Sequence, residues 1–75
     1  MKSHQQIETE KMLKRIENMK NLSSEEMTKA YLELRDNTDW AGMSNIDFNI
    51  RRKELSLIYD EIIKKQAEES QHDRG

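Results

Sequence analysis

Residues 45–67 read NIDFNIRRKELSLIYDEIIKKQA, the longest apolar and helix-favouring stretch of this 75-residue chain. At 100° per residue, one set of its apolar side chains falls within a single broad arc. This set, called the broad stripe below, comprises Phe48, Leu55, Ile58, Tyr59, Ile62 and Ile63. We therefore expect a helix over residues 45–67 that buries the broad stripe, with Leu55 and Ile62 near its centre.

A second apolar set lies almost opposite the first on the same helix. This second stripe consists of Ile46, Ile50 and Leu57. A two-helix hairpin would leave it in water, at about 25 cal/mol per Å² of apolar area not buried. Either another helix of the same chain covers it and closes a three-helix bundle, or another molecule does. We predict that it binds a partner, because short chains often gain buried area by symmetric pairing.

Two further helices are predicted before residue 45. Residues 5–20 follow a capping box of Ser3 and Gln6, in which each side chain satisfies a free backbone N–H of the other residue. The apolar positions of this helix form a thin stripe: Met12, Leu13, Ile16 and Met19. This stripe offers little surface with which to cover two neighbours, which is a further reason to expect an intermolecular contact.

The start of the second helix, over residues 23–35, is the clearest local signal in the chain. Ser23 can cap it, Glu26 stands three residues later, and Leu22 and Met27 can form a hydrophobic staple. Its apolar face comprises Met27, Ala30, Tyr31 and Leu34. Residues 36–44 lose the helical period and collect turn-forming residues, among them Gly42. Ser44 or Asn45 can then cap the third helix.

The composition favours an all-α chain. It has no Pro and no Cys, two Gly, 13 Lys and Arg against 15 Asp and Glu, and a net charge of −2. We expect a small helical bundle or hairpin of two to three helices, with dimerisation as a way to complete its core. Residues 1–67 would form this single domain, and residues 68–75, which offer nothing to bury, a disordered tail.

Few residues suggest catalysis or metal binding. His4 and His72 stand in polar sequence near the two ends, and no Cys is present as nucleophile or thiolate ligand. We therefore expect no enzyme activity, no metal and no cofactor. Residues 1–20 contain no apolar run that would act as a signal peptide, and no stretch reaches the ~20 apolar residues of a membrane span. A cytoplasmic location is the expectation.

Two residues outside the second stripe complete the predicted partner site. Trp40 lies in the connection, where it either plugs the end of the bundle or contacts a partner. Arg51 falls inside the broad stripe. Either it lies at the rim, or it is an exposed recognition residue beside Trp40 and Phe48. At the rim it would pair with an acid of its own chain: Asp36, Asp39 or Asp47.

The best-supported function is a small non-enzymatic protein–protein interaction module, such as an adaptor, inhibitor or regulator, that presents an apolar helix face to another protein or to itself. The alternative is a helical nucleic-acid-associated regulator. Its contacts would come from Arg51 and from Lys11, Lys14, Arg15, Arg52 and Lys53. The alternative is weaker because successive residues of a helix diverge by 100°. The small size, high charge and Ile/Lys/Asn/Glu bias resemble accessory proteins of AT-rich bacterial or phage genomes.

Overall fold

The computed structural model describes residues 1–73 and confirms the all-α prediction. These residues form three α-helices and no strand: α1 His4–Met19, α2 Ser24–Asn37 and α3 Asn45–Asp73, with the short 3₁₀-helix η1 Trp40–Gly42 between α2 and α3. None of these helices has the length and apolar character needed to cross a membrane.

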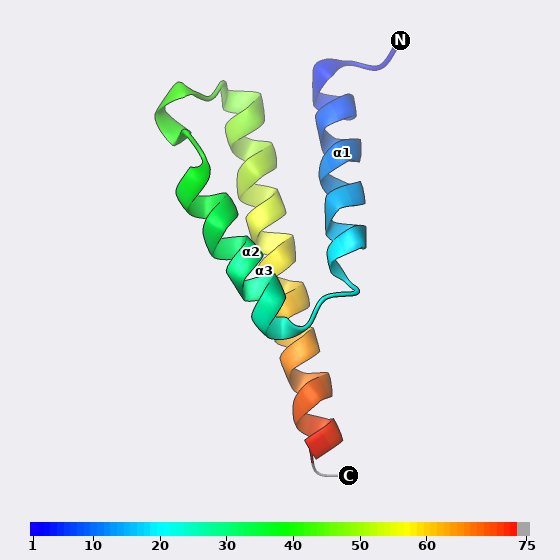
Figure 1. The fold of residues 1–75 in the computed structure, drawn as a ribbon. Coiled ribbons are helices and arrows are strands. Elements are labelled where there is room, and N and C mark those ends of the chain that lie inside the picture. Colours follow the sequence, from blue (N-terminus) through cyan, green and yellow to red (C-terminus); the bar gives the residue numbers. More distant parts are fainter. Residues whose placement is uncertain (74–75) are drawn as a thin grey trace.

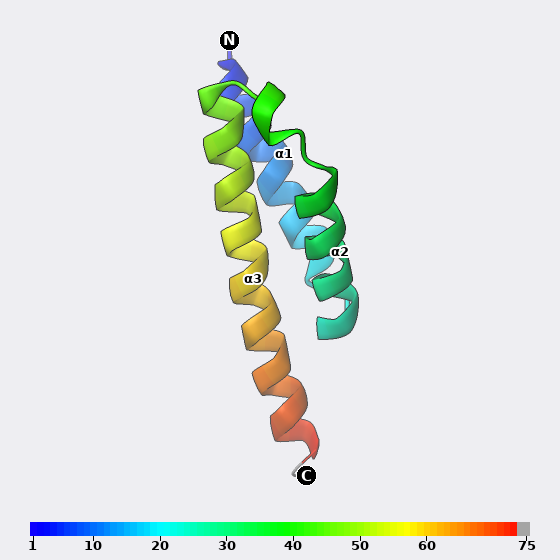
Figure 2. The same cartoon turned by 90° about the vertical axis from the view of Figure 1, so that its left-hand side faces the viewer.

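The long helix α3 is the spine on which the other two helices pack. α1 runs parallel to α3 and α2 runs antiparallel to both, as Figure 1 shows. α1 and α2 each pack mainly against α3 and hardly against each other. They meet at the loop over residues 20–23 and separate toward the other end, so the molecule is a wedge that opens at the N-terminal end of α3 (Figures 1 and 2).

The helix starts follow the predicted caps. The Ser3 hydroxyl accepts a bond from the Gln6 N–H, and the Gln6 side-chain oxygen accepts one from the Ser3 N–H. The Ser23 hydroxyl caps α2 by accepting a bond from the Glu26 N–H. Ser44 caps α3, because its hydroxyl accepts from the N–H of Asp47. Each of these bonds satisfies an N–H group that a helix leaves unpaired in its first turn.

The core takes residues from all three helices. Its buried cluster comprises Met12, Ile16, Met27, Ile58 and Ile62, and Leu55 is buried as well. Three residues predicted to be in the core are instead half exposed: Leu13 at 50%, Tyr59 at 54% and Ile63 at 49%. Because α1 and α2 pack on neighbouring sides of α3, the buried direction of α3 lies between its two stripes. The far edge of the broad stripe therefore faces solvent.

The chain itself covers much of the second stripe. Ile50 and Leu57 are partly buried and pack against the core cluster, whereas Ile46 is 44% exposed. α1 packs on this side of α3, as the bond between His4 and Asp47 and the ion pair between Arg15 and Glu54 show. The sequence left open whether a helix of the same chain or another molecule covers the second stripe. For Ile50 and Leu57 it is a helix of the same chain, α1.

α3 continues over residues 68–73, past the end at residue 67 that was expected from the sequence; residues 74–75 lie outside the described residues. Glu69 binds the first turn of α2, where it accepts bonds from the Ser24 N–H at 3.1 Å and the Ser24 hydroxyl at 2.5 Å. One turn earlier, Lys65 Nζ donates to the Lys20 carbonyl at the end of α1, at 3.0 Å. Both bonds match the partial charges at helix ends. α3 thus clamps the loop between α1 and α2.

We predict that Ile58→Ala destabilises the fold by about 2–5 kcal/mol, because it empties a fully packed position in the centre of the core. Ile58 is 1% exposed. A domain of this size has only a few kcal/mol of stability, so the variant could lose its helical signal altogether. Urea unfolding followed by circular dichroism measures the effect. The same substitution at the exposed Ile46 is the control, and equal losses at both sites would contradict the assigned core.

The clamp at Glu69 predicts a pH dependence. Its bonds to Ser24 lower the pKa of the Glu69 carboxyl. A lowered folded-state pKa adds stability that is complete above the unfolded pKa of about 4.3 and is lost as the pH falls through the folded pKa. We therefore expect Glu69→Gln to be less stable than the wild type at pH 7 and equal to it at strongly acidic pH. Urea titrations across this range test it. The exposed neighbour Glu68→Gln should show no such difference, and a Glu69 effect that persists in acid would contradict the explanation.

Candidate functional site

A polar cleft lies where the wedge opens, between α1 and the first turns of α3. Its volume is about 230 Å³, and Met43 closes one side. The other lining residues are His4, Glu8, Arg15, Asp47, Ile50, Arg51 and Glu54. The splayed helices leave a gap at this end that apolar side chains do not fill, and charged side chains occupy it instead.

The centre of the cleft is a buried carboxylate. Glu54 on α3 is only 1% exposed and is held by two parallel bonds from Arg15 on α1, from Nε and Nη2, each 2.9 Å long. This two-point geometry is the strongest form of the arginine–carboxylate pair. The bonds to Glu54 raise the pKa of Arg15 above its usual value. The pair therefore fixes one level of α1 against one level of α3.

Arg51 extends this contact to α2. Its Nε lies 3.3 Å from Glu54 Oε1, and its Nη1 donates to the Thr38 hydroxyl at 2.8 Å. Thr38 follows the last residue of α2 and donates in turn to the Leu34 carbonyl. We predicted that Arg51 pairs with Asp36, Asp39 or Asp47. This prediction was wrong, because its ion-pair partner is Glu54. Arg51 does lie at the rim, with its side chain 25% exposed.

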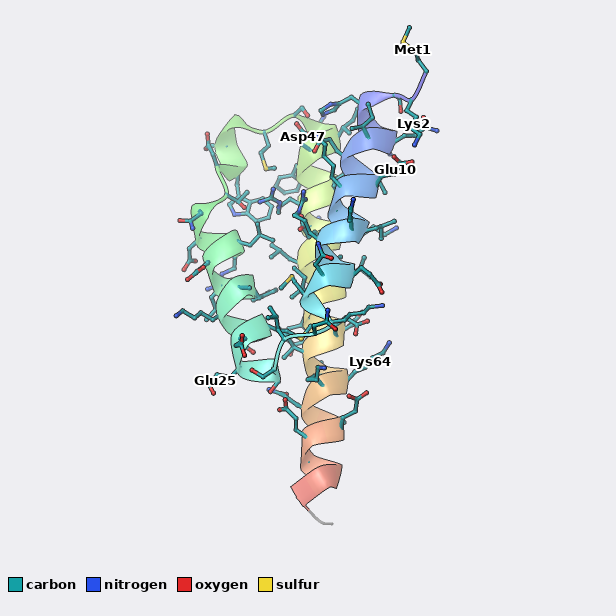
Figure 3. The ribbon with its side chains drawn as sticks, turned by 45° about the vertical axis from the view of Figure 1, so that its right-hand side comes forward. Met1, Lys2, Glu10, Glu25, Asp47 and Lys64 are labelled. Atoms are coloured by element: carbon teal, nitrogen blue, oxygen red, sulfur yellow. The ribbon has the colours of Figure 1, made fainter. Side chains whose placement is uncertain are left out.

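His4 and Asp47 close the outer end of the cleft. His4 Nε2 lies 2.8 Å from Asp47 Oδ1, which joins the first turn of α1 to the first turn of α3; Figure 3 labels Asp47 at this end of the molecule. The bond from His4 lowers the pKa of Asp47, and a bond from Ser44 and the positive charge of Arg51 act in the same direction. Ser44 and His4 both contact the carboxylate, so the hydroxyl is not paired with the imidazole as in a nucleophilic triad.

The charged side chains of the cleft pair with one another. Every buried side-chain nitrogen and oxygen among the described residues has a hydrogen-bond partner. In the same part of the chain, no three His, Asp or Glu side chains are placed to hold a metal ion. The arrangement thus works as a polar joint that links α1, α3 and the end of α2.

Aromatic, apolar and arginine side chains, some exposed and some partly buried, lie on a different side of the molecule, along the seam between α2 and α3. We call this surface the α2–α3 flank, and its residues are Tyr31, Leu32, Phe48, Arg52, Tyr59 and Ile63. Tyr59 lies 6.2 Å from Tyr31, centroid to centroid, and Arg52 lies over the Phe48 ring at 5.8 Å. Leu32, 41% exposed, lines a shallow depression of about 670 Å³ that reaches Gln66 on α3. Arginine and aromatic rings are enriched in protein interfaces.

The predicted partner site is divided between surfaces. Ile46 is exposed at the start of α3, Ile50 lines the cleft, and Leu57 is partly buried beside the core. Trp40 packs edge-on against Phe48 at 5.3 Å and donates from its indole to the Arg35 carbonyl at 3.3 Å. It therefore covers the upper end of the α2–α3 flank.

The residues proposed for nucleic-acid binding do not share one surface. Arg15 is bound to Glu54 on the side of α3 that faces α1, while Arg52 lies over Phe48 on the α2–α3 flank. Lys11 lies 3.7 Å from Glu8. Lys14 and Lys53 are exposed on α1 and α3, respectively. By helical spacing Lys11, Lys14 and Arg15 lie on one side of α1, and Arg51 shares Glu54 with Arg15. Arg52 lies on another surface, so the six residues do not form one basic stripe.

Sequence reasoning missed Glu54, Glu69 and the bond of His4. Glu54 lies on α3 between the directions of the two stripes, an arc that two packing helices would bury. Arg15 likewise adjoins the apolar stripe of α1. Opposite charges beside the core stripes of two helices are the signal that could have predicted this pair. Glu69 carried no such signal, because its partner is a helix start far away in the sequence.

Comparison with known proteins found no protein family that matches this chain, no similar curated protein and no similar solved structure.

We predict that Arg15→Met costs about 1–3 kcal/mol of stability, because it leaves a buried carboxylate short of its main partner. Adding Glu54→Met should recover part of the loss, since an apolar pair replaces an unpaired buried charge. Urea unfolding of both single variants and the double variant gives this double-mutant cycle. Losses that simply add would show that the two side chains do not depend on each other.

Proposed function

We propose that this chain is a small non-enzymatic protein–protein interaction module, an adaptor, inhibitor or regulator, that binds its partner through the α2–α3 flank. The observation that supports this most is the exposure of Tyr59 at 54% and Ile63 at 49%, with the Tyr59 ring 6.2 Å from Tyr31 across the seam. Single exposed apolar residues are ordinary, but several along one seam are typical of binding surfaces.

The flank has the chemistry of an interface anchor. Tyr59 and Ile63 stand one turn apart on α3, and Arg52 is already held against an aromatic ring. Tyrosine and arginine are among the residues that most often dominate the binding energy of an interface. The polar cleft is a weaker candidate, because its charged groups already bind one another.

The test is affinity capture with the immobilised full-length chain from cells that produce it. We expect the double variant Tyr59→Glu/Ile63→Glu to lose the proteins that the wild type retains, because a charge placed in an interface core is heavily penalised. Both positions are exposed in the free chain, so the fold should persist, and circular dichroism checks this.

Leu13→Glu is the matched control, since Leu13 is a comparably exposed apolar residue, at 50%, on α1. This variant should retain the same proteins as the wild type. Retention by the double variant, or equal loss by Leu13→Glu, would contradict binding through the α2–α3 flank.

A further inference from the structure

The exposed face of α3 has a symmetric order of side chains. At 100° per residue, its positions on the α2–α3 flank fall within about 80° of arc together with Ser56. Phe48 lies as far before the midpoint between Leu55 and Ser56 as Ile63 lies after it. Arg52 and Tyr59 are likewise equidistant from this midpoint. An antiparallel copy of the same face would therefore set Phe48 against Ile63 and Arg52 against Tyr59.

We propose that two copies of this chain pair through the α2–α3 flank, with their α3 helices antiparallel about a two-fold axis at the level of Leu55 and Ser56. This rests on the proposed function, because it names the occupant of the same flank. In a two-fold interface, a residue that contacts a second residue is contacted by that residue of the other copy in return. The face of α3 meets this condition at two pairs of positions.

The pairs are also complementary in chemistry. The Arg52 guanidinium already lies 5.8 Å from the centroid of the Phe48 ring. This contact keeps it on the α2–α3 flank, and the side of the guanidinium away from Phe48 is open to solvent. Tyr59 of the second copy would cover this free side and place the cation between two rings. Ser56 is exposed at the axis, and its small side chain allows the two helices to approach closely.

Charge at the edge of the face favours the antiparallel arrangement. Lys53 and Asp60 are both exposed and lie two turns apart on the edge away from α2. When two helices pair antiparallel about the axis, the same edge of each lies side by side. Lys53 of one copy then comes near Asp60 of the other, within reach of the long lysine side chain. In a parallel pair about a two-fold axis, the same edge of each helix lies on opposite sides of the contact, so Lys53 of one copy would not meet Asp60 of the other.

α2 widens the contact. The stripe from Phe48 to Ile63 is about 22 Å long at 1.5 Å per residue, which is short for an interface that usually buries about 800 Å² on each side. On α2, Tyr31 contacts Tyr59 of this stripe, and Leu32 lines the depression that α2 and α3 share. The two copies would thus bring together four helices, α2 and α3 of each.

The test is sedimentation equilibrium of the full-length chain up to about 1 mM. We expect a concentration-dependent dimer, and we expect Ser56→Glu to weaken it at least about tenfold by placing two like charges at the axis. Lys53→Glu and Asp60→Lys should each weaken the dimer. The double exchange Lys53→Glu/Asp60→Lys should restore it, because each copy then carries the reversed pair. Lys14→Glu on α1 is the control and should change nothing.

A wild type that stays monomeric over the whole range overturns the proposal, as does a dimer that tolerates Ser56→Glu or that the double exchange does not restore. Circular dichroism of every variant separates loss of pairing from loss of fold. A monomeric wild type whose capture of other proteins still depends on Tyr59 and Ile63 overturns the dimer and leaves the proposed function standing. A dimer that shows the expected variant effects, together with capture that does not depend on Tyr59 and Ile63, supports the dimer and overturns the proposed function.

Discussion

The pairing of Arg15 with the buried Glu54 is the contact on which the arrangement of the helices depends. The apolar core leaves the register of α1 against α3 loosely defined, because Met12 and Met27 are two of its most deeply buried side chains and methionine adapts to many packings. The two 2.9 Å bonds of Arg15 allow one register only. Removing a buried charge pair altogether often costs little stability, so its contribution here is to specificity of the arrangement.

Polar contacts occur along the whole joint between α1 and α3. Bonds join His4 to Asp47, Arg15 to Glu54 and the Lys20 carbonyl to Lys65, and these partners are 43, 39 and 45 residues apart in sequence. The partners follow in the same order along both helices, as parallel helices require. The apolar cluster lies between these contacts, so it supplies the burial and the polar pairs supply the alignment.

Local signals in the sequence predicted the helices but not how they pack. The starts at Ser3, Ser23 and Ser44 depend on residues three positions away, and all three were predicted correctly. Leu55 and Ile62 were placed correctly in the core, whereas Tyr59 and Ile63 were not, because the buried arc of α3 depends on where α1 and α2 lie around it. The polar cleft could not be predicted for the same reason: it exists because two helices splay apart on a third, which no local pattern records.

The order in which the chain is synthesised bears on how this wedge can fold. α1 and α2 leave the ribosome first, yet they hardly pack against each other. Both of them pack on α3, which follows them in the chain. Lys65 and Glu69, toward the C-terminal end of α3, hold the loop between α1 and α2. Two helices without a mutual core are marginal by themselves in water. A first half made of α1 and α2 alone therefore lacks the helix on which both of them pack, and α3 has to emerge before the core can close.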